Sequence, residues 1–392
     1  MKLFNAILLI KNYLFKFLNT IFLLPYFMIN FFFKVKIGKI KSSKLGHLVL
    51  DTLAFKHFIE KKNKSKNKYI IFNEKNIANT FFYNSIEKNI KVNKFSNFLN
   101  LIYNLSNNSF LKKFLIIRME FLEKYYSEIN IYNNFSKNFH FSENTNSNFK
   151  KLGIDNRKKF YLIHNRDSNY LKKTNNNFER HSIRNFSINN LDNSTKIISG
   201  EYSSVRVGRE VEKITTDLNS IDYSSSKYVS DEMDLFLFKK SDFYIGSDAG
   251  IWALALLFNK PYSIINYRLY GNLHRFFNNN KLPILISRMY DIRTNKVLKF
   301  KDIRKKKYHL FTNSTEFQKN KISFHENSID DISGLLIEIS NLLSKKDISR
   351  EEKELKSYFS RRFLEEFTNL DPTKFFINFG TNFIKNNLDL VN

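Results

Sequence analysis

Residues 241–266, SDFYIGSDAGIWALALLFNKPYSIIN, decide the fold that we expect for this chain. The apolar residues 243–245 predict a buried strand, and the turn at 246–250 leads into an apolar helix over 251–258. A Lys-Pro pair ends this helix, and residues 262–265 predict a second strand. This order is typical of a parallel sheet with crossover helices, in which ligands bind at the carboxyl ends of the strands.

The turn in this segment has the composition of a nucleotide-binding loop. Gly250 lets the backbone turn tightly into the helix, whose first N–H groups lack internal partners and suit a phosphate oxygen. The carboxylate of Asp248 would repel a phosphate, so we expect it to cap the helix or to bind a hydroxyl or a ring N–H. We predict that Ser247, Asp248 and Gly250 hold the nucleotide end of a ligand. A helix–strand unit without a ligand is the alternative.

Another predicted strand, residues 160–164 (FYLIH), ends in a cluster of polar side chains. His164, Arg166 and Asp167 lie within four residues at its carboxyl end, and all three are candidate substrate ligands. An arginine can form two parallel, charge-assisted hydrogen bonds with a diphosphate, which makes Arg166 the main candidate for a phosphate ligand. For His164 the alternative is a core histidine, and for the Arg-Asp pair it is a surface ion pair.

Three further side chains complete the candidate set. Arg184 lies in a polar stretch, 171–190, that we expect to form a loop near the site. Arg206 ends a predicted strand and is either a second cation near the phosphates or a surface arginine. His47 begins a predicted helix and is a candidate general base on an acceptor hydroxyl, with a structural hydrogen bond as the alternative. A carboxylate such as Asp51 is a second candidate for the base.

The composition excludes several classes of function. The formal net charge of +27 suggests nucleic acid as a partner. However, the excess of Lys, Asn, Ile and Phe follows the codon usage of AT-rich genomes, and the chain has no basic recognition helix, zinc spacing or aromatic-basic stacking motif. We therefore expect no nucleic-acid partner. The absence of cysteine excludes disulfides and thiolate catalysis, and the eight histidines show no metal-ligand spacing, so we predict no metal site.

The amino-terminal region is apolar and basic. Residues 1–50 contain eight lysines and no acidic residue, and residues 17–33 are uncharged and mostly apolar. A spanning helix needs about 20 apolar residues, so we favour an interfacial or shallowly inserted anchor over residues 1–34, with its lysines facing an anionic membrane surface. Five lysines within 34–44 place the following domain on the cytoplasmic side. Helices packed on the globular body are the alternative.

The length of 392 residues suggests two domains after this anchor. A strand–loop–helix–strand order over 35–72 predicts a first doubly wound domain over 35–150, and the Asn- and Ser-rich stretch 129–151 marks its boundary. The second domain is expected over 158–335, with its last strand at 322–324. Residues 336–392 are expected to be helical.

Several motifs resemble those of known glycosyltransferases. GSDAGIWALALLFNKP resembles the donor-site turn of GT-B glycosyltransferases, including the lipopolysaccharide heptosyltransferases. IHNRDSNY, paired with that turn, resembles the His-x-Arg and Ser-rich motifs of bacterial fucosyltransferases. The segments LGHL, HNRDSNYL, HSIRN, VRVG, SDFYIGSDAG and HENSIDDI are similar, in this order, to segments of a family of bacterial glycosyltransferases. In the fucosyltransferase motif a second arginine follows the first, whereas here Asp167 follows Arg166, which counts against a GDP-fucose donor.

This resemblance implies an α/β, GT-B-like fold with two Rossmann-like doubly wound domains facing across a cleft. It implies that the second domain holds a nucleotide-sugar donor without a metal, because helix N-termini and cationic side chains hold the diphosphate. Arg166 matches the arginine that contacts the phosphates. We expect a membrane-associated enzyme on the cytoplasmic face of the bacterial inner membrane. It would move a sugar to a glycan or lipid-linked acceptor of lipopolysaccharide or capsule. A nucleotide-sugar or glycan-binding protein without catalysis is the alternative.

Overall fold

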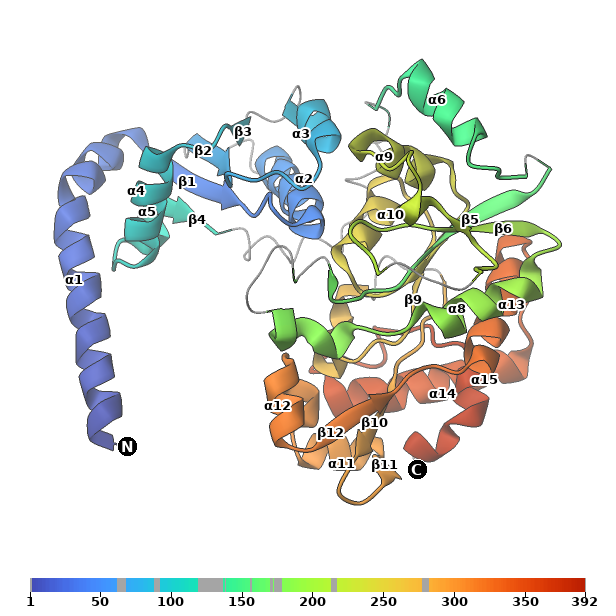
Figure 1. Ribbon diagram of the computed structural model, residues 1–392. Coiled ribbons are helices and arrows are strands. Elements are labelled where there is room, and N and C mark those ends of the chain that lie inside the picture. Colours follow the sequence, from blue (N-terminus) through green and yellow to red (C-terminus); the bar gives the residue numbers. More distant parts are fainter. Residues whose placement is uncertain are drawn as a thin grey trace. The chain divides into compact units, whose positions relative to one another are not determined.

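The computed structural model describes residues 2–61, 68–87, 92–118, 137, 139–155, 157–169, 172, 178–212, 217–276 and 282–391. The chain forms two compact units, Met1–Tyr126 and Ser127–Asn392. Each unit is built around a parallel sheet with helices on it (Figure 1). The expected α/β class with two doubly wound parallel sheets is therefore confirmed.

The first unit contains a four-stranded sheet of order β3-β2-β1-β4, in which every pairing is parallel. The chain runs from β1 to β2 and β3 on one side, and then returns to β4 on the other side of β1, which is the doubly wound pattern. Its strands are β1 (Val35–Ile40), β2 (Lys68–Asn73), β3 (Val92–Asn93) and β4 (Ile116–Ile117). Its helices are α1 (Lys2–Phe33), α2 (Leu45–Lys61), α3 (Thr80–Glu87), α4 (Asn97–Asn107) and α5 (Lys112–Leu115).

The amino-terminal apolar segment is a single helix, α1, of 32 residues with Pro25 inside it. Its stretch Leu9–Phe33 is long and apolar enough to cross a membrane, and only 17% of its most apolar window is buried. The helix is longer than the apolar run 17–33 indicated, because lysines at 11 and 16 do not interrupt helical geometry. The expected apolar segment is therefore present as a largely exposed helix.

The second unit contains a five-stranded sheet of order β7-β6-β5-β8-β9, again entirely parallel. All residues of β5 after Lys159 are buried, as expected for a strand covered on both faces. In Figure 1, α8 and α13 lie on one side of the sheet, and α9 and α10 lie on the other. The strands are β5 (Lys159–His164), β6 (Tyr202–Arg206), β7 (Ile221–Asp222), β8 (Tyr244–Gly246) and β9 (Tyr262–Ile264). The helices around the sheet are α6 (Glu143–Lys150), α8 (Ile188–Ser194), α9 (Asp231–Lys240), α10 (Ala253–Leu257) and α13 (Ile329–Leu343).

The expected last strand of this domain belongs to a different sheet. β12 (Ile322–His325) pairs antiparallel with β10 (Arg288–Asp291), which also pairs antiparallel with β11 (Lys296–Val297). The apolar residues at 322–324 predicted a strand correctly, but a strand carries no local mark of its pairing partner. Two short helices, α11 (Phe300–Lys305) and α12 (Ser314–Lys319), lie between β11 and β12 in the chain.

Residues 143–150, which we expected in the first domain, form α6 in the second unit. Phe149 of α6 packs against Phe160 of β5 and Phe236 of α9, with ring centroids 5.7 and 5.2 Å apart. The polar composition of 129–151 indicated a boundary region, but it did not indicate which of the two units this short helix belongs to.

The carboxyl-terminal helices α14 (Arg350–Phe367) and α15 (Thr381–Asn386) are attached to α13 through a buried lysine. The Lys356 ammonium is 2.5 Å from Glu338 and 2.6 Å from the side-chain oxygen of Asn378. The second carboxylate oxygen of Glu338 accepts the Thr381 N–H at 2.8 Å. Because each charge in this buried pair has its partners, the pair joins the three helices.

Gly246 is required where β8 ends beside β5. A Cβ atom there would overlap the carbonyl oxygen of His164 and would lie 2.7 Å from the Tyr244 hydroxyl. Backbone atoms of a central strand cannot move aside, so only glycine permits this approach.

We therefore expect Gly246→Ala to lower the free energy of unfolding of the second unit by about 1–3 kcal/mol, as overpacking does. The single tryptophan, Trp252, lies in this unit and is buried against Tyr262, so its fluorescence in a urea titration reports this transition. Gly200→Ala is the matched control, because a Cβ at Gly200 meets nothing within 4 Å. Equal unfolding midpoints for the two variants would contradict the prediction.

Candidate functional site

The candidate site lies where the winding of the second sheet changes direction. From β5 the chain passes to β6 and β7 on one side, and then to β8 and β9 on the other. In such sheets, ligands bind at the carboxyl ends of the two strands that flank this point, here β5 and β8. The Ser247 N–H donates to the His164 carbonyl at 3.1 Å, which extends the β5–β8 pairing into the turn. Sequence-predicted groups from 164–167 and from 247–250 are thus brought together.

His164 is enclosed between the two flanking loops. Its Nδ1 shares a hydrogen bond of 3.0 Å with the Ser247 hydroxyl, and both residues are buried. On the other side, Gly208 adopts a φ of 137°, and a Cβ there would lie 3.1 Å from the imidazole Cδ2. Burial, with the charges of Arg206 and Arg166, lowers the pKa of His164 to about 3. The imidazole is therefore neutral at physiological pH and orients the Ser247 hydroxyl.

Arg166 is a buried cation without a fixed anion. Its side chain is 9% exposed, and within the described part of the chain no hydrogen bond or ion pair involves its guanidinium. Burial and the nearby charge of Arg184 lower the pKa of Arg166 to about 10, while Asp248 and Asp167 act in the opposite direction. The guanidinium is thus still charged at neutral pH. A largely buried cation that has no partner among the described residues is a binding group for an anion.

Three other arginines near this edge of the sheet have a carboxylate partner. In the Arg184–Asp248 pair the atoms are 3.2 Å apart, in Arg206–Asp222 they are 3.3 Å apart, and in Arg268–Glu326 they are 3.4 Å apart. Among these four arginines, Arg166 is the one for which the described residues provide no carboxylate partner.

Asp248 does not cap a helix, which corrects one of the two roles that we expected for it. The helical segment begins at Gly250 as a 3-10 turn, Gly250–Trp252, whose cap residue Ala249 provides no side-chain hydrogen bond. The following α10 has five residues, so the expected helix over 251–258 is shorter than predicted. Asp248 pairs instead with Arg184, at the end of a 3-10 segment, Phe178–Arg184. Within the polar stretch containing Arg184, residues 171 and 173–177 lie outside the described residues.

Arg206 and Asp167 both hold the loop after β6. Arg206 is 1% exposed, which excludes a surface arginine, and it donates to the Glu212 carbonyl at 3.1 Å. Asp167 accepts the backbone N–H groups of Glu212 at 2.8 Å and of Asn169 at 2.9 Å. Both side chains therefore keep this loop, and with it Gly208, against the end of β5.

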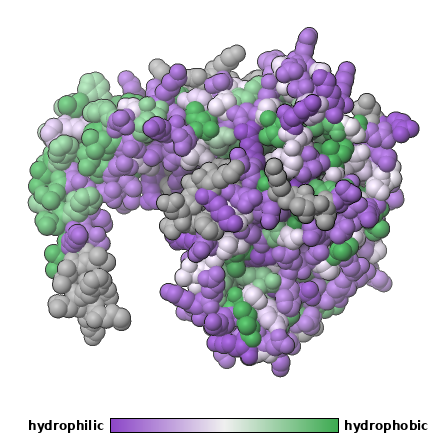
Figure 2. Space-filling model, in the orientation of Figure 1, coloured by the Kyte–Doolittle hydropathy of each residue, from purple (hydrophilic) through white to green (hydrophobic). Residues whose placement is uncertain are grey.

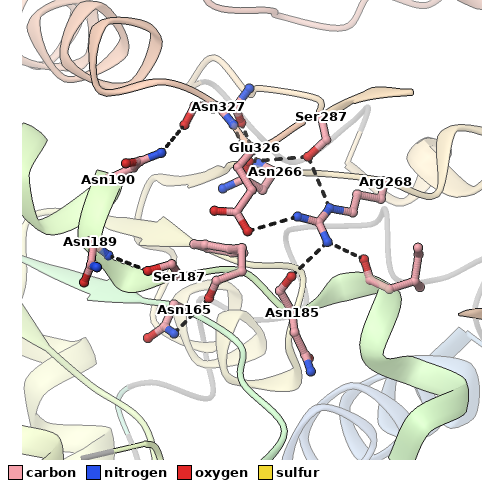
Figure 3. Close-up of polar contacts among 12 residues, drawn as sticks. Asn165, Asn185, Ser187, Asn189, Asn190, Asn266, Arg268, Ser287, Glu326 and Asn327 are labelled. Atoms are coloured by element: carbon pink, nitrogen blue, oxygen red, sulfur yellow. Dashed lines mark hydrogen bonds and ion pairs between the residues drawn. The ribbon is translucent and has the colours of Figure 1, made fainter. Parts of the chain in front are cut away.

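Sequence reasoning missed a buried network centred on Arg268, which is 8% exposed (Figure 3). The Arg268 guanidinium donates at 2.8 Å to the carbonyls of Ile183 and Asn185, the two neighbours of Arg184. The Phe186 N–H then donates to the Arg166 carbonyl at 3.1 Å. The network thereby fixes the backbone on both sides of Arg184 and joins that segment to the end of β5.

A pair of asparagines extends this network to β9 and α8. The Asn266 N–H donates to the Asn327 side chain at 2.8 Å, and the Asn327 N–H donates to the Asn266 side chain at 2.6 Å. The Asn327 carbonyl accepts the side-chain amide of Asn190, in α8, at 3.0 Å (Figure 3). Asn266 and Arg268 directly follow the strand predicted at 262–265. The rule that polar residues gather at strand ends would therefore have identified them.

His47 belongs to the first unit, where it lies in the first turn of α2. Its Nδ1 is 3.5 Å from a carboxylate oxygen of Asp51, one helical turn later. The His47 side chain is 40% exposed, whereas that of Asp51 is 2% exposed. The buried carboxylate can orient the exposed imidazole, as in general-base pairs. Among the described residues, no group of three or more His, Asp or Glu side chains is arranged to hold a metal ion.

Comparisons with known proteins give distant structural similarity only. No protein-family profile and no curated protein matches the sequence. A family 9 glycosyl transferase from Veillonella parvula matches 60% of this chain and 81% of its own, at 11% identity and a TM-score of 0.34. The iron-containing dodecameric glycosyltransferase TibC from enterotoxigenic E. coli covers 59% of this chain and 57% of its own, at 12% identity and a TM-score of 0.29. The wall teichoic acid polymerase TagF covers 79% and 88%, at 11% identity and a TM-score of 0.23.

The buried neutral His164 predicts an acid-sensitive second unit. The pKa of about 3 in the folded state lies below the ordinary 6.5, so the unfolded chain binds the extra proton between these values. The stability that depends on neutral His164 is complete above pH 6.5 and decreases as the pH falls, by up to about 1.4 kcal/mol per pH unit. We expect the loss between pH 7.5 and 5 to be about 2 kcal/mol smaller in His164→Gln than in the wild type. Urea unfolding followed by Trp252 fluorescence measures this difference, and equal losses would contradict it.

Proposed function

We propose that this chain is a GT-B glycosyltransferase that transfers a sugar from a nucleotide-sugar donor to an acceptor hydroxyl. The observation that carries this proposal is the buried Arg166 at the ends of β5 and β8, which has no ion-pair partner among the described residues. A phosphate-rich ligand at a doubly wound sheet binds at this place. The motif resemblance supports the same donor class.

Arg166 would stabilise the leaving diphosphate. When the bond between the anomeric carbon and the diphosphate oxygen breaks, negative charge develops on that oxygen. A guanidinium that is already largely buried loses little further hydration when it stabilises this charge. Because Arg184 is paired with Asp248 at 3.2 Å, it would orient the donor while adding little net charge. The hydroxyl of Ser247, positioned by neutral His164, is a further donor or acceptor for the ligand.

The role that we first gave to the helix N-terminus is smaller in this proposal. The segment after Gly250 is a 3-10 turn followed by the five residues of α10, and such a short helix has a weak dipole. Stabilisation of the diphosphate therefore depends mainly on side-chain cations. We accordingly propose a metal-independent mechanism, in which Arg166 has the role that a divalent cation has in other transferases.

His47 would remove the proton from the acceptor hydroxyl as that oxygen bonds to the anomeric carbon. Its contact with Asp51 supports this role, since the carboxylate stabilises the imidazolium that forms. The eight lysines and the exposed apolar helix at the amino terminus suit an acceptor carried on anionic lipid. We propose a glycan or lipid-linked acceptor of lipopolysaccharide or capsule, with the protein on the cytoplasmic face of the bacterial inner membrane.

A thermal-shift panel with EDTA present tests the donor site. We expect one of GDP, UDP, ADP, CMP or dTDP to stabilise the second unit, and Arg166→Ala to weaken its binding by about tenfold or more, because a charge-assisted bond to phosphate is lost. Arg293→Ala is the matched control, because Arg293 is a surface arginine that pairs with Asp291. Unchanged binding in Arg166→Ala would exclude this site.

A transfer assay tests catalysis: it measures how much sugar moves from the selected nucleotide sugar to an acceptor in a membrane lipid extract. We expect His47→Ala to lower kcat by about 100-fold or more with little change in donor affinity, since general bases contribute about 10²–10⁴. Near-normal turnover in His47→Ala would remove its proposed role. Nucleotide binding without any transfer or donor hydrolysis would favour the alternative, a nucleotide-sugar or glycan-binding protein.

A further inference from the structure

Helix α1 exposes an apolar surface that the rest of the first unit leaves uncovered. In its stretch Leu9–Phe33, the most apolar window is 17% buried, so this is not the core helix of a globular body. Figure 2 shows hydrophobic residues gathered over α1. The side chains that are more than half exposed include Leu14, Phe17, Leu18, Phe22, Ile29 and Phe32. The eight lysines and absence of acids in residues 1–50 complement an anionic surface.

The middle of α1 is attached to the turn between α4 and α5. The Asn19 side-chain amide donates to the Asn108 carbonyl at 3.2 Å, and the Phe110 N–H donates to the Thr20 hydroxyl at 3.0 Å. One turn later, Leu23 is 1% exposed and packs in a cluster with Leu115 and Ile116. One face of the apolar stretch is therefore occupied by protein near its centre.

These contacts are incompatible with α1 crossing a bilayer. If residues 9–33 spanned it, Asn19 and Thr20 would lie near its midplane and would bring the turn at 108–111 into the hydrocarbon. Irregular backbone exposed to lipid does not occur there, and the adjacent Lys112 and Lys113 would add the cost of buried charge. The part of α1 before Asn19 is shorter than the roughly 20 residues of a span and contains lysines.

Phe110, in the turn between α4 and α5, and Phe114, in α5, extend the apolar surface of the helix. Phe110 is 53% exposed and lies against the Tyr13 ring, with centroids 6.3 Å apart. Phe114 is 59% exposed and lies against the Phe27 ring at 5.7 Å. An open hollow of about 480 Å³ is lined by Leu9, Ile10, Tyr13, Leu14, Phe17 and Phe110. Its lining is almost entirely apolar, which suits an acyl chain.

We propose that α1, together with Phe110 and Phe114, is a monotopic insertion surface for an anionic phospholipid bilayer. The helix lies in the plane of the interface, and an acyl chain occupies the hollow beside Phe110. Both ends of α1 are then on the same side of the membrane as the rest of the chain. This inference specifies the form of the proposed membrane association and does not depend on transferase activity.

Single-cysteine labelling tests the topology, and the absence of native cysteine makes it direct. Asn5→Cys marks the start of α1, and Leu310→Cys, at a residue 60% exposed in the second unit, marks the side of the main body. Sealed membrane vesicles carrying either variant are treated with a membrane-impermeant maleimide before and after detergent is added. We expect both cysteines to be labelled from the same side. Labelling from opposite sides would show that α1 spans the membrane and would overturn the proposal.

A binding assay tests the surface itself. We expect Phe110→Ser/Phe114→Ser to reduce partitioning into vesicles containing phosphatidylglycerol by about tenfold or more, since two exposed aromatic rings no longer insert. Leu310→Ser/Phe376→Ser removes two exposed apolar side chains from the second unit and should leave partitioning unchanged. Equal partitioning of the two double variants, or no vesicle binding by the wild type, would refute the surface. Nucleotide-induced thermal shifts of the same variants in detergent test the donor site separately.

Discussion

The close approach of β5 and β8 is the constraint on which the candidate site depends. The two strands pair in parallel up to His164 and Gly246, and the Ser247 N–H continues this pairing to the His164 carbonyl. A side chain at position 246 would collide with that carbonyl. Because Gly246 has none, the two strands stay in contact up to their last residues. Polar side chains on a strand buried on both faces can then project only beyond its end. The His164–Ser247 bond and Arg166 therefore lie at one point.

The distribution of charge around that point gives the site its chemistry. A buried guanidinium is costly unless an anion or several carbonyls accept its N–H groups. Arg268 meets this condition through two backbone carbonyls and Glu326, and Arg206 does so through Asp222 and a carbonyl. Within the described residues Arg166 lacks such partners, and an incoming phosphate would supply them. The cost of leaving this cation unpaired in the free protein would thus be recovered on binding.

The first unit combines a sheet with an apolar helix that is too exposed to be core. Contacts at Asn19 and Thr20 join the helix to the turn after α4, while its outer face keeps rings such as Phe22 exposed. The same helix is therefore both part of the unit and, as we propose, its contact with lipid. In-plane insertion would hold the unit close to the interface, where the lipid-linked acceptor that we propose would present its hydroxyl. The exposed surface would then serve the proposed reaction by keeping the enzyme and its acceptor close together.

The sequence alone determined the elements and several of the groups at their ends. The strands predicted at 35–40 and 160–164 correspond to β1 and β5, and Arg166 and Ser247 lie just after β5 and β8, where strand-end reasoning placed them. For β5, burial on both faces leaves a continuous apolar run bounded by polar residues. Only the tertiary structure decided which charges are neutralised. Asp248 pairs with Arg184 from 64 residues away, and β12 pairs with β10 in a separate sheet. Such partners depend on how distant segments pack, and pairing across long separations leaves no periodic trace in the local sequence.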